Sequence, residues 1–211
     1  MKKRFFILGI FFAAIIAACA TLQRGSQYEQ ARNELLYGDP TTALGLFERI
    51  AAADPNELYF SKFPEGSWTY VGRAAYAANL LPRAREALER ATSLHREDDM
   101  AKLYLGLTDA RLGDRDRGIT NIDNGMRGIH DWIEWATQAH RFTWGQWWDP
   151  NREIRSAIER DLKLISQREY SMPELIRDGE WLGKRVEEEI VLASRDEQRD
   201  RNREGGDNRF P

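Results

Sequence analysis

Residues 68–91 read WTYVGRAAYAANLLPRAREALERA, and this stretch decides the fold. Apolar side chains recur every three or four residues on both sides of Pro82, a spacing that predicts two amphipathic helices. Proline fits the first turn of a helix and breaks its interior, so Pro82 marks the start of the second helix. Gly72 and Ala84 are small residues, which let the two helices approach closely.

The same pattern returns 34 residues later, where Gly106 follows Gly72 and Gly118 follows Ala84. An earlier copy places Ala43 41 residues before Ala84, so seven residues are inserted between the first two copies. A period of this length indicates an array of helix-turn-helix units. The helices are predicted near residues 27–37, 41–53, 67–79, 82–94, 99–112 and 115–127.

This periodicity resembles the tetratricopeptide repeat (TPR), whose pattern is W-x2-L-G-x2-Y followed by A-x3-F and a closing proline. The middle copy matches it best, with Trp68-x2-Val71-Gly72-x2-Ala75. The resemblance implies an all-α fold, in which a right-handed stack of helix-turn-helix hairpins ends in a C-terminal capping helix. Three repeats are assigned to residues 27–128.

The insertion between the first two repeats falls within residues 56–66 and contains Tyr59, Phe60 and Phe63. An aromatic insertion in a helical-repeat loop suits a contact with a partner. The other interpretation is a short helical turn that packs these rings onto neighbouring helices.

Helical spacing continues over residues 129–142 and, after a loop, through residue 168. Asp149 is expected to cap the second of these helices, with Pro150 in its first turn. Together the two helices predict a divergent fourth hairpin.

An amphipathic helix that starts near Ser171 is expected to cap the stack, which completes a region spanning residues 129–193. Beyond it, residues 194–211 are almost wholly polar. Such a segment buries too little apolar surface to offset the entropy of ordering, so a charged, disordered tail is expected.

The N-terminus has the organisation of an export signal. A basic Lys2-Lys3-Arg4 precedes an apolar run of about 14 residues, fewer than the roughly 20 that a membrane-spanning helix needs. The run ends in Ile16-Ala17-Ala18-Cys19, which resembles the lipobox of bacterial lipoproteins. The resemblance implies that residues 1–18 are removed and that Cys19 carries lipid. An uncleaved signal anchor with an incidental or buried cysteine is the alternative.

The lipoprotein resemblance also implies a location. At least two acyl chains such as palmitate anchor a protein stably, whereas one chain holds it marginally. In bacterial lipoproteins the residue after the lipidated cysteine directs sorting, and a residue other than aspartate implies the outer membrane. Ala20 occupies this position, so the resemblance implies the outer membrane, on the periplasmic side. Residues 19–26 would then form the lipidated N-terminus and a short linker.

In TPR proteins the first helix of each repeat lines a groove that receives a peptide or a helix of a partner. In this chain Arg32 and Arg73 fall at equivalent places, and arginines beside tyrosines suit an acidic or carboxylate-bearing ligand. Ordinary solvated arginines are the alternative. The resemblance assigns to the groove Tyr28, Arg32, Leu35, Thr69, Arg73, Tyr76, Leu103, Leu107 and Arg111.

A second candidate surface is aromatic, because five of the seven tryptophans lie within 17 residues. Tryptophan offers a large contact area at little entropic cost and is enriched in interface hot spots. The cluster suits packing between the repeats and the next helix, a hot spot for a partner, or a platform for sugar rings. Its members are Trp132, Trp135, Trp144, Trp147 and Trp148.

Other functions find little support in the sequence. The formal charge of −3 and the lack of a clustered basic face argue against a nucleic-acid partner. The three histidines lack metal-site spacing, and no catalytic or cofactor-binding motif occurs. No catalytic residue, metal or cofactor is therefore predicted, and a small-molecule ligand is not expected.

These observations predict a non-enzymatic, membrane-anchored TPR lipoprotein that acts as a protein-protein interaction adaptor in the bacterial cell envelope. A cell-wall glycan-binding lipoprotein that uses the tryptophan cluster is the alternative.

Overall fold

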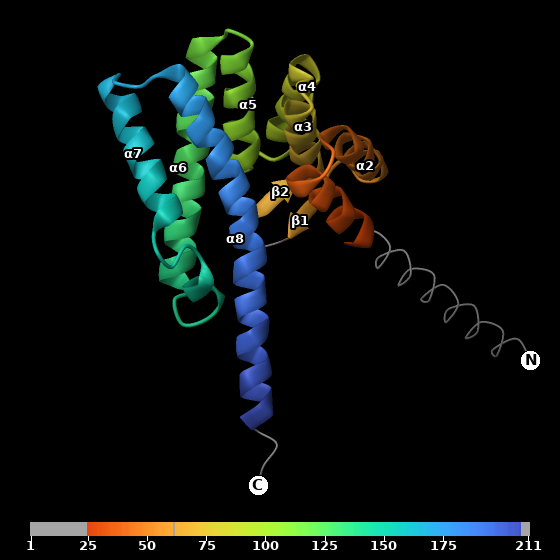
Figure 1. Cartoon of the computed structure of the whole chain (residues 1–211), viewed down its shortest axis with the longest axis vertical. Helices are drawn as coiled ribbons and strands as arrows, with labels where there is room; N and C mark the ends of the chain where they lie inside the picture. Colours follow the sequence, from red (N-terminus) through yellow and green to blue (C-terminus); the bar gives the residue numbers. More distant parts are fainter. Residues whose placement is uncertain (1–24, 61, 208–211) are drawn as a thin grey trace, which may run out of the picture.

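Helices make up most of the chain that the computed structural model describes, residues 25–60 and 62–207 (Figure 1). Successive helices pack on one another in the order of the sequence, so the all-α prediction is confirmed. The elements are a helix over residues 25–37, α2 (Pro40–Ala53), β1 (Leu58–Phe60), β2 (Pro64–Gly66), α3 (Ser67–Ala77), α4 (Leu81–Leu94), α5 (Asp99–Arg111), α6 (Arg115–Ala139), η1 (Trp144–Trp147), α7 (Glu153–Gln167) and α8 (Met172–Asp207).

Aspartate side chains cap the N-termini of several of these helices. The Asp39 carboxylate accepts a hydrogen bond from the Thr42 backbone N–H at 2.8 Å, and Asp98 accepts one from Ala101 N–H at 2.8 Å. Asp114 caps α6 in the same way. Each cap satisfies a backbone donor that has no partner within the helix, which is worth about 1 kcal/mol. The caps explain why the turns lie where the sequence predicted them.

The repeated small residues lie where two helices touch. A Cβ atom built on Gly72 would be 2.3 Å from Leu88 Cγ, and one built on Gly106 would be 2.5 Å from the Ile122 backbone nitrogen. Both distances are shorter than van der Waals contact. The pairs α3–α4 and α5–α6 therefore pack at a separation that only a glycine allows.

The helix α6 is longer than predicted. A break was expected between the third repeat and a helix over residues 129–142, but α6 runs without interruption through residue 139. The buried side chains of Met126, Ile129 and Ile133 lie along both parts. Their burial offsets the cost of a mid-helix glycine such as Gly125, about 1 kcal/mol. The expected fourth hairpin thus shares its first helix with the third repeat.

The aromatic insertion forms a two-stranded antiparallel hairpin rather than a helical turn. Strands β1 and β2 pair with Leu58 opposite Gly66 and Phe60 opposite Pro64. In the connection between them, the ring of Phe63 is buried and packs edge-on against Trp132, with ring centroids 5.0 Å apart.

The helix α7 starts at Glu153, later than Asp149-Pro150 suggested. Arg152 adopts a left-handed conformation (φ 55°) just before it, so the chain turns once more before the helix begins. Asp149 still caps the helix from a distance, because its carboxylate accepts hydrogen bonds from the backbone N–H groups of Ile154 (2.9 Å) and Arg155 (3.1 Å). Pro150 therefore lies in the preceding turn and not in the first turn of α7.

The last helix, α8, is 36 residues long and crosses the body of the molecule (Figure 1). Its apolar stripe, Leu182, Val186 and Ile190, is buried. Gly183 brings α8 close to α5, because a Cβ there would lie 2.4 Å from the Tyr104 hydroxyl oxygen. The expected capping helix therefore covers a face of the array and is not confined to its end.

The predicted disordered tail is helical as far as Asp207. Ion pairs one helical turn apart, Arg199 with Asp196 and Arg201 with Glu197, hold this part of α8. Each such pair contributes a few tenths of a kcal/mol. Lys62 of the hairpin also pairs with Glu197, which fastens the helix to the body.

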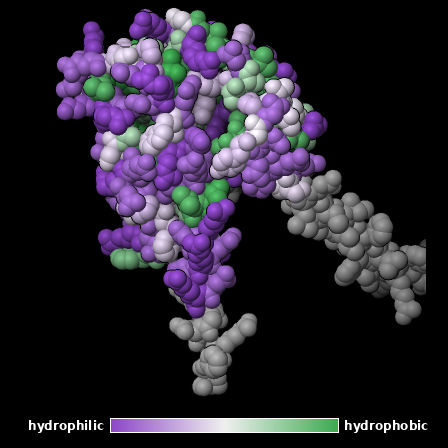
Figure 2. Space-filling view, viewed as in Figure 1, coloured by the Kyte–Doolittle hydropathy of each residue, from purple (hydrophilic) through white to green (hydrophobic). Residues whose placement is uncertain are grey.

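The predicted signal peptide over residues 1–18, Cys19, most of the predicted linker and the last four residues lie outside the described residues. Within the described part of the chain, no helix combines the length and the apolar composition that a membrane span requires. Figure 2 shows a mainly hydrophilic face, on which hydrophobic residues form small separate patches.

Candidate binding surfaces

The residues assigned to a partner-binding groove are mostly buried. The structure brings together Tyr28, Arg32, Thr69, Arg73, Tyr76 and Leu107 along the helix over residues 25–37, α3 and α5, but α8 covers this face. Leu103 is buried too, Leu35 is half-buried, and Arg111 remains exposed. A groove for a partner was therefore the wrong expectation for most of these side chains, because the chain's own last helix covers them.

The two arginines at equivalent repeat positions bind the same carboxylate. Arg32 Nε donates to Glu187 Oε2 at 3.1 Å, and Arg73 pairs with the other oxygen of Glu187. Arg73 also donates to Glu65 Oε2 of β2 at 2.7 Å. The acidic ligand that the sequence suggested for Arg32 and Arg73 is a residue of this chain.

The charged groups of this buried network depend on one another. Burial opposes ionisation of Glu187, but Arg73 and Arg32 outweigh it and hold the pKa of Glu187 below its usual value. Burial raises the pKa of Glu65 to about 8, against the opposing effect of Arg73. Removing one partner of a buried ion pair typically costs about 3–5 kcal/mol. The network therefore fixes α8 in place rather than offering a surface to a ligand.

Two other groove candidates also have structural partners. The Thr69 hydroxyl donates to Asp98 Oδ2 at 2.5 Å, and the same oxygen accepts the Gly66 backbone N–H at 2.8 Å. The Tyr76 hydroxyl donates to Glu180 of α8 at 2.6 Å. Thr69 thereby joins β2 to the start of α5, and Tyr76 joins α3 to α8.

The inner part of the tryptophan cluster belongs to the core. Trp148 is only 2% exposed and meets Trp132 edge-on, with ring centroids 4.5 Å apart. Trp147 is half-buried and packs against the same core. These three rings join η1 to α6.

The outer part of the cluster is a patch that we call the aromatic tip, formed by Trp135, His140, Phe142 and Trp144. Trp135 is 51% exposed and Phe142 is 81% exposed. The rings of His140 and Trp144 stack with centroids 4.4 Å apart. Lys62 Nζ lies 4.8 Å from the centroid of the Trp144 ring. The tip thus presents large apolar rings to solvent at the end of α6.

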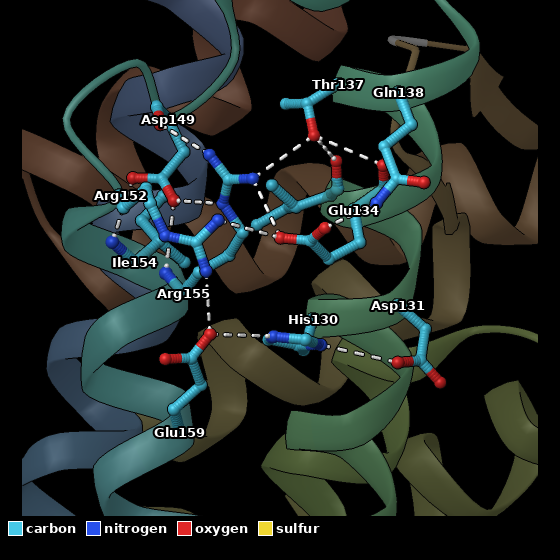
Figure 3. A network of polar contacts seen from close by, with 11 residues as sticks. His130, Asp131, Glu134, Thr137, Gln138, Asp149, Arg152, Ile154, Arg155 and Glu159 are labelled. Carbon is cyan, nitrogen blue, oxygen red and sulfur yellow. Dashed lines mark hydrogen bonds and ion pairs between the residues drawn. The ribbon is translucent and has the colours of Figure 1, made fainter.

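A polar network joins α6, α7 and the turn that follows η1 (Figure 3). Arg155 of α7 donates to Asp149 Oδ2 at 2.9 Å and to Glu134 Oε1 of α6 at 2.8 Å. Glu189 of α8 accepts the Asp149 backbone N–H at 2.7 Å. Three helices therefore converge on the turn that follows η1, close in sequence to Trp144 and Trp135 of the aromatic tip.

Glu187 and Glu65 were not predicted as important residues. A signal for Glu187 exists in the sequence, since Gly179, Gly183 and Glu187 recur every four residues and so share one helix face. A carboxylate on the face that glycines press against a neighbour is a candidate for burial. Glu65 had no comparable signal, because the hairpin itself was not foreseen.

No cluster of three or more histidine, cysteine, aspartate or glutamate side chains with metal-binding geometry occurs among residues 25–60 and 62–207. Comparisons with known proteins yield no match: no protein family, no curated protein and no solved structure corresponds to this chain.

Proposed function

We propose that this chain is a lipid-anchored, TPR-like protein of the bacterial envelope that acts as a non-enzymatic adaptor and binds a protein partner through the aromatic tip. The observation that carries the proposal is the exposure of Trp135 and Phe142 on a support made by α6, α7 and α8. The face formed by the helix over residues 25–37, α3 and α5 is already covered by α8.

The TPR-like assignment is supported by spacing and packing. Gly72 and Gly106 are 34 residues apart, and each lies against the second helix of its own pair. The lipid anchor is supported by the lipobox-like residues that end in Cys19. Stacked hairpins make a stiff body, and a lipid anchor raises its effective concentration near membrane-associated partners.

The aromatic tip has the physical properties of an interface hot spot. Exposed tryptophan and phenylalanine bury a large apolar area on binding and lose little side-chain entropy. The rings that pack against Trp135, including Trp132 and Trp144, limit its movement. A preorganised contact costs less to order when a partner binds.

The partner interface is tested by quantitative crosslinking in cells followed by binding measurements with the captured protein. We expect the Trp135→Ala/Phe142→Ala double variant to weaken binding at least about tenfold. Tyr37→Ala is the matched control, because Tyr37 is also an exposed aromatic residue, at 71%. Equal binding by the double variant and the parent would refute the role of the aromatic tip.

The anchor is tested separately with Cys19→Ser. We expect this variant to leave the membrane fraction, because it lacks the thiol that accepts lipid. A variant that stays with the membrane through its uncleaved N-terminus would contradict the lipoprotein assignment.

A cell-wall glycan is the second candidate for the same tip. Trp135 is half exposed, and the exposed Gln138, whose amide nitrogen donates to Glu134 at 2.8 Å, follows one turn along the same face of α6. An indole and an amide on one face suit a sugar ring with its hydroxyl groups. Co-sedimentation with purified peptidoglycan at low salt tests this candidate. Sedimentation that Trp135→Ala abolishes would favour the glycan, and none with the parent would remove it.

A further inference from the structure

A cavity of about 280 Å³ lies where the helix over residues 25–37, α3, α5 and α8 meet. It is separate from the aromatic tip. Leu35, Leu36 and Ala77 form its apolar side. Arg111 and Lys184, both exposed, lie on its polar side. The cavity thus combines an apolar wall with two cations.

The two cations at the rim are weakly neutralised. The Arg111 guanidinium lies 4.6 Å from the centroid of the Tyr76 ring and donates to the neutral amide of Asn79 at 2.7 Å. Among the described residues Arg111 forms no ion pair. Lys184 has its nearest carboxylate, Glu188, 4.0 Å away. Both side chains are therefore available to an anion.

A third cation, Arg73, contributes to the wall from within the core. It is 2% exposed, and its Nε–H has no hydrogen-bond acceptor in the described part of the chain. Burial raises the pKa of the neighbouring Glu65 carboxyl to about 8, against the opposing effect of Arg73. Arg32 and Arg73 share the carboxylate of Glu187, and Arg32 Nη1 also lies 3.5 Å from Glu29 Oε1.

The remaining carboxylate at the cavity is Glu180, which accepts the Tyr76 hydroxyl at 2.6 Å. Lys184 also has Glu188 within 4.0 Å, so Arg111 is the lining cation that no carboxylate pairs with among the described residues. An arginine without a counter-ion beside an apolar wall favours an anion over a neutral molecule of the same shape.

We propose that this cavity binds a compact apolar group that carries one carboxylate. The carboxylate would accept hydrogen bonds from Arg111 and Lys184 at the rim, and the apolar group would lie against Leu35, Leu36 and Ala77. At about 30 Å³ for a water-sized group, the volume holds about nine non-hydrogen atoms. This size corresponds to a small aromatic or branched acid, or to the last residue of a peptide with a free C-terminus.

Calorimetric titration of the full chain tests the proposal with two matched pairs of probes. Phenylacetate is compared with phenylacetamide, and a peptide ending in phenylalanine with a free carboxylate is compared with its amide. We expect at least about tenfold tighter binding of the charged member of one pair, because charge-assisted hydrogen bonds are roughly twice as strong as neutral ones. Binding of the free acid indicates a small molecule, and binding of the peptide alone indicates a protein terminus.

Two variants locate the site. Arg111→Ala is expected to weaken binding of the charged probe at least about tenfold, whereas Arg90→Ala should have no effect. Arg90 is a matched control because its guanidinium also stacks on an aromatic ring, that of Trp68, at 4.0 Å, but it does not line the cavity. Ala77→Leu should abolish binding by filling the cavity while both rim cations remain.

Three outcomes would overturn the proposal: equal affinity for the acid and the amide, charged-probe binding that survives both cavity variants, or no binding by any of the four probes. Thermal unfolding of each variant ensures that lost binding does not reflect lost folding.

Discussion

Arg73 in α3 forms an ion pair with Glu187 in α8, although 114 residues separate them along the chain. Arg32 reaches the same carboxylate from the first described helix. One buried glutamate thereby joins three segments that have no local connection. Isolated buried charges are costly, so these segments must assemble together.

Neutralising Glu187 should destabilise the fold. We expect Glu187→Gln to lower the free energy of unfolding by about 3–5 kcal/mol, because Arg32 and Arg73 would lose their shared counter-ion in a buried site. Urea denaturation measures the change. The adjacent Glu188→Gln is the control and should shift stability by no more than about 0.5 kcal/mol. Similar stabilities for the two variants would contradict the role assigned to the network.

The other glutamate of the network should make stability depend on pH in the opposite sense from most carboxylates. Its pKa is about 8 in the folded chain against an ordinary 4.5, so between these values the folded state binds more protons than the unfolded state. The contribution of Glu65 to the unfolding free energy therefore falls as pH rises, by up to about 1.4 kcal/mol per pH unit. Glu65→Gln should have a shallower slope between about pH 5 and 8. Parallel pH profiles for the two proteins would show that Glu65 is not protonated.

The tryptophan cluster should divide into structural and exposed members. Trp148→Ala is expected to lower the unfolding free energy by about 3–5 kcal/mol, since it empties a buried site. For Trp135→Ala, whose ring is half exposed, we expect a loss below about 1 kcal/mol. Chemical denaturation of both variants provides the measurement. A large loss for Trp135→Ala would mean that this ring serves packing rather than binding.

The close helix contacts can be tested with two glycine substitutions of the same kind. In Gly106→Ala the new Cβ would lie 2.5 Å from backbone nitrogen of Ile122, and we expect a loss of about 1–3 kcal/mol. In Gly45→Ala the nearest atom would be 3.9 Å away, on a flexible arginine, so the variant should gain about 0.5–1 kcal/mol from helix propensity. Thermal unfolding of both proteins distinguishes the two effects. Equal changes would argue against the α5–α6 packing distance.

The helix pairs were predictable because their signals are local. Pro82, the Asp39 and Asp114 caps and the apolar spacing act within one or two helical turns. The helices α2 and α4 begin and end near the predicted residues, and α6 begins where predicted although it ends later. The hairpin was not predictable in this way. Its two strands of three residues have no extended alternation, and they are held by contacts such as Phe63 with Trp132.

The groove residues show that local spacing does not reveal whether a distant segment buries a candidate site. Their spacing correctly placed Arg32 and Arg73 on one surface, since helical periodicity decides which residues share a face. Whether that face meets solvent or another helix depends on segments far away in the chain. The exposed part of the tryptophan cluster likewise became visible only when η1 and α7 were placed against α6.

By itself, the sequence determined the helical pairs, their 34-residue spacing and the amphipathic stripe of α8, because turn chemistry and apolar periodicity are properties of neighbouring residues. Only the tertiary structure decided what that stripe covers. An apolar face gains nearly the same free energy against any apolar surface, since the hydrophobic effect is non-directional. Three residues of α8 select the surface that it covers. The charge of Glu187 matches Arg32 and Arg73, and the small size of Gly179 and Gly183 allows the close approach of α5. Both matches exist only once the helices are assembled.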